Sequence, residues 1–189
     1  EHVFKAPAPM QDHFNMADAA QKIKFNELNA AYQSASDSVG SAMGLYGLSS
    51  MAFALLLTFY SSRLKINRKY VHMFSLIAGG VGFLSMSFLP NPSYLNLSFI
   101  LIGFSWGSIL SMPYAMLSSS VDEDKMGLMM GLFNMFIVIP QIIAALGGVN
   151  LFSKMFGDVA IAPMLLAGSS LVIGGLCNFL ITDPKVIKG

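Results

Sequence analysis

Five long apolar stretches constrain this chain more than any other feature of its sequence. A helix that crosses the ~30 Å hydrocarbon core of a bilayer needs about 20 predominantly apolar residues. None of the five stretches contains Asp, Glu, Lys or Arg. Lipid offers no partners for backbone N–H and C=O groups, so a spanning segment is a helix or part of a closed barrel, and the two-residue alternation of barrel strands is absent here. We therefore predict an all-α membrane protein with five transmembrane helices, at residues 39–60, 71–89, 94–117, 126–149 and 159–182.

The composition agrees with a membrane protein and argues against other classes. Hydrophobic residues make up 54% of the chain and charged residues 11%, whereas a soluble domain has about 25% charged residues. A net charge of +1 implies no nucleic-acid-binding surface. The single cysteine, Cys177, excludes an internal disulfide, and neither metal-ligand spacing nor a glycine-rich phosphate loop is present. We expect no enzyme activity and no cofactor, and the start at Glu1 without a signal peptide indicates a truncated chain.

Basic residues on alternate sides of the spans predict the orientation, because Lys and Arg concentrate in cytoplasmic loops. The loops on the opposite side carry only Lys154. We therefore expect a multi-pass protein of the cell (inner) membrane. Its C-terminal tail, 183–189, would lie in the cytoplasm, and its polar segment 1–38 would lie outside the cell. The residues on the predicted cytoplasmic side are Arg63, Lys65, Arg68, Lys69, Lys125, Lys185 and Lys188.

The polar segment before the first span allows two interpretations. Residues 16–33 contain good helix formers, with Phe25, Leu28 and Tyr32 at helical spacing. One interpretation is an amphipathic helix that lies on the outer membrane surface. The other is a loose external loop, since the apolar face is narrow.

Two amides in the fourth span are candidates for substrate binding, because polar side chains inside a membrane are costly. Asn134 and Gln141 are seven residues apart and so share one helix face. Between them, Pro140 frees a backbone carbonyl one turn back and predicts a local helix break. Amides both donate and accept hydrogen bonds, which suits recognition of hydroxyl groups. The alternative is that they hold this helix to a neighbour.

The third span carries further candidates. Gly107, Ser111 and Tyr114 are spaced to share one helix face, and Trp106 and Pro113, a second expected helix break, share an adjacent face. Trp106 lies in the middle of its span rather than at the interface where membrane Trp residues usually lie, so it is placed to stack on a sugar ring. Helix packing is the alternative role.

Tyr46 in the first span is a similar but weaker candidate for stacking. Three pairs of glycines spaced four residues apart also predict that helices approach one another closely in a bundle. These pairs are Gly40/Gly44, Gly103/Gly107 and Gly127/Gly131.

The loop at 64–69 resembles the cytoplasmic loop motif of the major facilitator superfamily. Lys65, Arg68 and Lys69 match its basic positions, Leu64 stands where the motif has an acid, and Asn67 stands where it has a glycine. Because Asn tolerates the left-handed conformation, we expect the turn to persist while the charge latch is lost.

Residues 126–148 are similar to the eleventh helix of the glycoside-pentoside-hexuronide cation symporters, especially sucrose transporters, in which an Asn precedes a Val-Ile-Pro-Gln run. Residues 31–60 are likewise similar to their eighth helix and its approach. The resemblance implies helices eight to twelve of a twelve-helix transporter, which form most of its C-terminal six-helix bundle. It also implies a disaccharide substrate, a proton as the coupling cation, and a missing N-terminal half that carries the proton-coupling acid.

Two rival functions stay open. One is a major facilitator for another solute, although an organic anion would call for an intramembrane Lys or Arg, and the five stretches contain none. The other is a membrane subunit with several spans and no transport activity.

Overall fold

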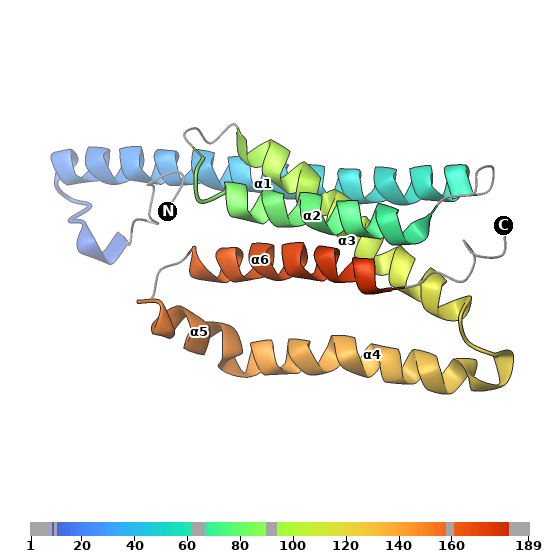
Figure 1. Cartoon of the computed structure of the whole chain (residues 1–189). Coiled ribbons are helices and arrows are strands. Elements are labelled where there is room, and N and C mark those ends of the chain that lie inside the picture. The colour runs from blue at the N-terminus through green and yellow to red at the C-terminus, as the bar shows by residue number, and fades with distance from the viewer. Residues whose placement is uncertain (1–8, 10, 62–66, 90–93, 158–160, 182–189) are drawn as a thin grey trace.

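The computed structural model describes residues 9, 11–61, 67–89, 94–157 and 161–181, and every regular element in these ranges is helical. Figure 1 shows the long helices lying roughly side by side. The elements are η1 (Gln11–His13), α1 (Ala19–Ser61), α2 (Arg68–Ser85), α3 (Leu95–Ser118), η3 (Glu123–Lys125), α4 (Met126–Ile143), η4 (Ala144–Gly148), α5 (Val149–Met155), α6 (Ala162–Cys177) and η5 (Asn178–Leu180).

Among the described residues, four helical stretches are long and apolar enough to cross a membrane. They are Ala19–Tyr60, Leu95–Ser118, Glu123–Met155 and Ala162–Leu180. The helix that corresponds to the other predicted span, α2, has 18 residues and starts with Arg68 and Lys69, which lower its mean hydropathy. Its spanning of the membrane stays a prediction.

The segment before the first span is helical from residue 19 onward and continues into that span without a break. The Asp18 side chain accepts a hydrogen bond from the Ala20 N–H at 3.0 Å, which satisfies one free donor at the helix start. With 43 residues, α1 is about 64 Å long, roughly twice the thickness of the hydrocarbon core. The loop interpretation is therefore wrong for these residues, and the helical segment extends α1 along its own axis (Figure 1).

The interior of the bundle consists of close backbone contacts among α1, α2, α3 and α6. A Cβ on Gly107 would meet the Ser50 carbonyl of α1 at 2.9 Å, so the predicted pair Gly103/Gly107 does mediate a helix contact. Glycines without that spacing do the same between α2 and α6, where a Cβ on Gly80 would lie 2.7 Å from the Gly168 carbonyl. At Gly40/Gly44 and Gly127/Gly131 no atom of another described residue lies within 4 Å of the Cβ position, so these two pairs mediate no contact between the described helices.

Buried polar side chains connect α2 with α3. The His72 Nδ1 lies 2.8 Å from the Ser108 Oγ, and both side chains are buried. Further along the same helix pair, the hydroxyls of Ser85 and Ser98 are 2.8 Å apart. A hydrogen-bonded pair satisfies groups that would be costly to bury alone, so α2 and α3 form a fixed unit.

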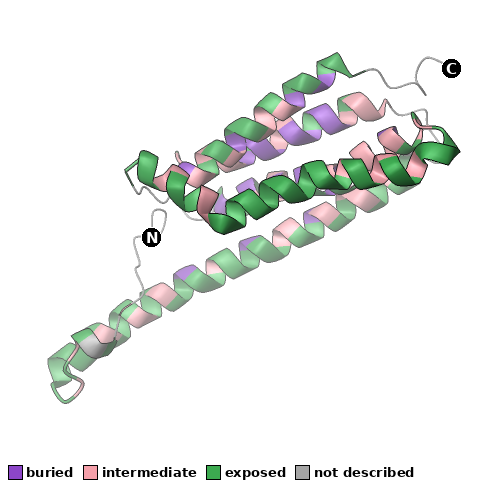
Figure 2. Cartoon of the chain, turned by 90° about the horizontal axis from the view of Figure 1, so that it is seen from below, coloured by how far each residue is buried: buried purple, intermediate pink, exposed green. Residues whose placement is uncertain are grey.

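The fourth predicted span packs differently from the rest. Helix α4 contains no buried residue, and the helix nearest the viewer in Figure 2 is exposed along almost its whole length. Outside its own span, α4 contacts chiefly α3. It is the least embedded of the long helices.

Candidate functional site

Two of the predicted binding residues meet across the junction of α3 and α4. The Tyr114 hydroxyl donates a hydrogen bond of 2.6 Å to the Asn134 Oδ1. The Tyr114 ring also meets the Phe133 ring edge-on, with centroids 5.0 Å apart. The sequence pattern selected Tyr114 and Asn134 separately, and the structure brings them together.

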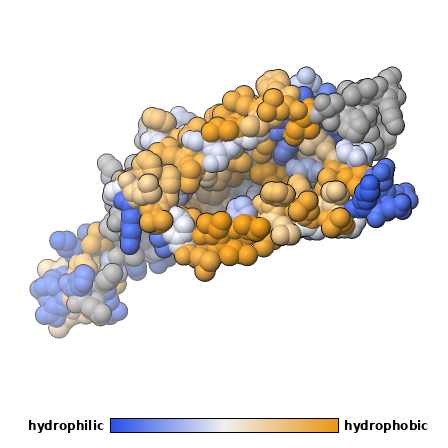
Figure 3. Space-filling model, turned by 60° about the horizontal axis from the view of Figure 1, so that its bottom comes forward, coloured by the Kyte–Doolittle hydropathy of each residue, from blue (hydrophilic) through white to orange (hydrophobic). Residues whose placement is uncertain are grey.

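Gln141 lies seven residues beyond Asn134 on α4, or about 10 Å along the helix axis. Gln141 is exposed, and its side chain makes no hydrogen bond to other residues that the structure describes, although its backbone carbonyl accepts one from the Ala144 N–H. Figure 3 shows a hollow bordered by apolar side chains on the face where α4 comes forward. The exposed Gln141 side chain is accessible to a solute.

The predicted face of Gly107, Ser111 and Tyr114 is divided between two neighbours, which corrects the expectation of one shared surface. Gly107 packs against α1, whereas Tyr114 reaches α4. The Ser111 hydroxyl donates to the Gly107 carbonyl at 2.7 Å, so it is satisfied within its own helix. Trp106 is 43% exposed, and its role in stacking stays a prediction.

Tyr46 lies in the packed interior rather than on an open surface. It is partly buried against a cluster that contains Ala42, Met86, Leu95 and Ile102. This environment favours a packing role over contact with a solute.

Neither predicted helix break occurs at its proline. Pro113 lies inside α3 and Pro140 inside α4, and both helices continue beyond them. Proline has a helical φ, so the loss of one N–H donor need not disrupt the neighbouring dihedrals. Non-helical dihedrals occur instead at Gly147, with φ 105° and ψ 9°, inside the π-helical turn η4.

The basic loop motif adopts a different geometry from the expected turn. Asn67 has φ −76° and ψ 96°, so it is extended rather than left-handed, and it precedes α2 as the flanking residue. A residue immediately before a helix commonly has β-region dihedrals, so Asn67 needs no positive φ at this position. Lys65 lies outside the described residues.

Arg68 and Lys69 hold the start of α2 to the ends of two other helices. The Arg68 guanidinium donates to the Ala115 carbonyl at 2.7 Å and to the Ser119 hydroxyl at 2.9 Å, at the end of α3. The Lys69 Nζ donates to the Phe179 carbonyl at 2.9 Å. Cations at helix C-termini satisfy free carbonyls and oppose the negative end of the dipole. The sequence analysis missed these contacts and the His72–Ser108 pair, although Arg68 and His72, four residues apart, share a helix face.

The side chains of this arrangement offer hydrogen-bond donors and acceptors. Within the described ranges, no three His, Cys, Asp or Glu side chains gather where they could hold a metal ion. A phenol, two amides and nearby aromatic rings recognise neutral polar solutes through donors, acceptors and ring faces.

The similarity of this sequence to known proteins shows the class of protein to which the helical bundle belongs. The sequence profile of the Major Facilitator Superfamily matches residues 28–145, which is more than half of the chain. The chain belongs to this family of membrane transporters, and it is an integral membrane protein with several long apolar helices.

Part of the chain is similar to two plant proteins. The chain is 36% identical over 84 residues to sucrose transport protein SUT2 of Oryza sativa subsp. indica, and equally to that of subsp. japonica. The matched region is 43% of this chain and 17% of each relative, so the chain spans only a small part of these proteins. No solved structure matches the chain.

Proposed function

We propose that this chain is part of a proton-coupled symporter that carries a disaccharide by alternating access. The name of the rice relatives supports a sugar substrate, and the family supports transport. The proposed arrangement places five spans in the cell membrane with the C-terminus in the cytoplasm, beside an N-terminal half of the same transporter.

The observation that carries this proposal is the contact between Tyr114 and Asn134. Because the phenol donates to the Asn134 Oδ1, the Asn134 amide nitrogen keeps its two donors and the phenol oxygen keeps acceptor capacity. Adjacent donors and acceptors match vicinal hydroxyl groups of a sugar. In this proposal Gln141 binds further hydroxyls along α4, and Trp106 stacks on a sugar ring.

The proton carrier in this proposal lies outside the present chain. The five predicted spans contain no Asp or Glu, and a coupling acid is expected to be an intramembrane carboxyl group. The proposal therefore assigns sugar recognition to these helices and proton binding to the other half.

The test is uptake of labelled sucrose and maltose by the full-length transporter reconstituted in liposomes. Asn134→Leu and Tyr114→Phe should each reduce uptake about tenfold at equal amounts of folded protein, since a lost hydrogen bond in a site is worth roughly 1.5 kcal/mol. Asn150→Leu and Tyr94→Phe change the same residue types at exposed positions on α5 and at the start of α3, and should have no effect. Unchanged uptake in the first pair of variants would remove this contact from the site.

A further inference from the structure

The long apolar stretch Glu123–Met155 is not one uniform helix. Helix α4 ends at Ile143, the π-helical turn η4 follows, and α5 starts at Val149. Single π-helical turns within helices are often found at functional sites, and sharp changes of helix direction have local causes of this kind. This turn therefore calls for a local explanation.

Two consecutive glycines produce the turn for different reasons. Gly147 has a φ of 105°, which side chains disfavour, although a Cβ there would meet no other atom within 4 Å. Gly148 has an ordinary helical φ of −56°, but a Cβ there would lie 2.8 Å from the Ile143 carbonyl. The turn thus requires a glycine at 147 for its positive φ, and a glycine at 148 because a side chain there would collide with the Ile143 carbonyl.

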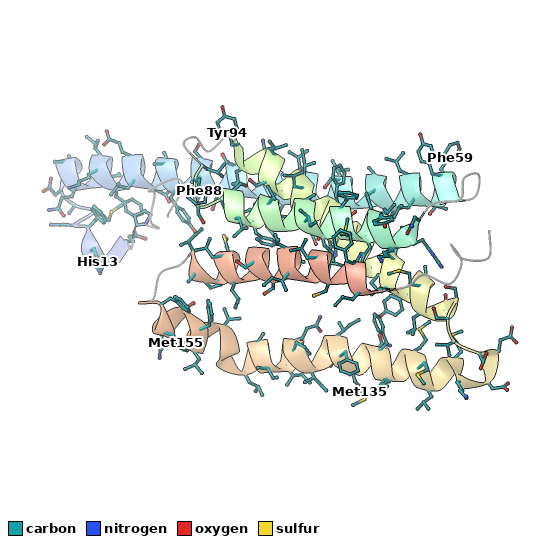
Figure 4. The ribbon with its side chains drawn as sticks, viewed as in Figure 1. His13, Phe59, Phe88, Tyr94, Met135 and Met155 are labelled. Atoms are coloured by element: carbon teal, nitrogen blue, oxygen red, sulfur yellow. The ribbon has the colours of Figure 1, made fainter. Side chains whose placement is uncertain are left out.

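The two sides of the turn are attached to different parts of the bundle. Helix α5 packs on α6, whereas α4 contacts α3, where Tyr114 bonds to Asn134. Figure 4 shows Met135 on α4 and Met155 on α5, on opposite sides of the turn. Between these attachments α4 has no buried residue that would fix it to the other helices.

Pro140 weakens the helix immediately before the turn. It has no N–H to donate to the Phe136 carbonyl one turn back, so α4 has one backbone hydrogen bond fewer just before Ala144. A helix that loses a hydrogen bond next to a positive φ bends there at lower cost than elsewhere along its length.

From these observations we infer that Gly147 and Gly148 form a hinge, about which α4 swings while α5 stays packed on α6. Swinging α4 away from α3 separates Asn134 from Tyr114. Only the link between this motion and sugar access rests on the proposed function. The hinge itself rests on the backbone geometry and the packing of α4.

The experiment measures distances between spin labels on the chain in lipid nanodiscs, with no sugar added. The native Cys177, exposed on α6, supplies one label. The second is Met135→Cys on α4 or Met155→Cys on α5, both exposed positions. The hinge predicts that the distribution of label-to-label distances is at least twice as wide for Met135→Cys as for Met155→Cys. Equal widths would refute the hinge, and this comparison needs no glycine variant.

Glycine variants then locate the motion. Gly147→Ala disfavours the positive φ by about 5- to 30-fold in population and should collapse the broad α4 distribution to one narrow peak. Gly147→Asn tolerates that conformation better and should keep most of the width. Gly131→Ala, at an open position on α4, is the matched control and should match the parent. Equal effects of Gly147→Ala and Gly131→Ala on the distance distribution would refute the hinge. If the distances show the hinge but the full-length transporter takes up no sugar, only the transport proposal is refuted.

Discussion

The contact between α2 and α6 at Gly80 and Gly168 provides a quantitative test of the packing. A Cβ on Gly80 would lie 2.7 Å from the Gly168 carbonyl, and a Cβ on Gly168 would lie 3.0 Å from the Gly80 carbonyl. The Val172 and Leu84 side chains lie equally close to these Cβ positions, but the two carbonyls belong to the backbone and cannot turn away. The helices must therefore move apart, and overpacking of this kind costs about 1–3 kcal/mol. We expect Gly80→Ala and Gly168→Ala each to destabilise the chain by that amount.

Thermal unfolding of the purified chain in detergent, followed by circular dichroism, measures this effect. A loss of 1–3 kcal/mol corresponds to a decrease in Tm of about 2–12 °C for a chain of this size. Gly174→Ala is the matched control on α6, since nothing lies within 4 Å of its Cβ position, and it should leave Tm unchanged or raise it slightly. The double variant should lose less than the sum of the single losses, because one separation relieves both contacts. If Gly80→Ala and Gly174→Ala have the same Tm, the inference that α2 and α6 are in close backbone contact at Gly80 is refuted.

Three further variants test the other contacts. Ser108→Ala leaves the buried His72 ring without its partner and should reduce unfolding free energy by about 1–3 kcal/mol, whereas Ser111→Ala, whose hydroxyl bonds within its own helix, should change it little. Arg68→Gln removes charged donors from the end of α3 and should lower Tm by several degrees. Faster proteolysis after α3 is an independent measurement. An unchanged Tm would contradict a stabilising role for the contact between Arg68 and α3. Gln141→Ala should reduce sugar uptake more than it reduces the amount of folded protein in the membrane, and equal losses of both would assign Gln141 to packing.

The sequence predicted the all-helical class because charge-free stretches of this length have few alternatives in a bilayer. The predicted stretch 94–117 coincides with α3 to within a residue at each end. The extension of α1 was harder to predict, because the apolar face of this segment is narrow and its good helix formers alone did not exclude an external loop.

The contacts between helices were less predictable. Gly103/Gly107 has the recognised spacing, but Gly80 and Gly168 mediate an equally close contact without it, since crossing geometry rather than spacing decides which glycines face a neighbour. The helix break was expected at Pro140 and lies at Gly147, because a missing N–H is evident in the sequence and a positive φ is not. Tyr114 and Asn134 were both chosen as polar residues in apolar spans, but their contact depends on the packing of α4 against α3.

The most direct test of the proposed function is solute uptake by the full-length transporter in liposomes, with and without an imposed pH gradient. The proposal predicts that an inwardly directed proton gradient drives accumulation of sucrose or maltose, and that Asn134→Leu reduces this accumulation about tenfold while Asn150→Leu does not. Accumulation of another class of solute in place of these sugars, or sugar uptake that ignores the gradient, would contradict it.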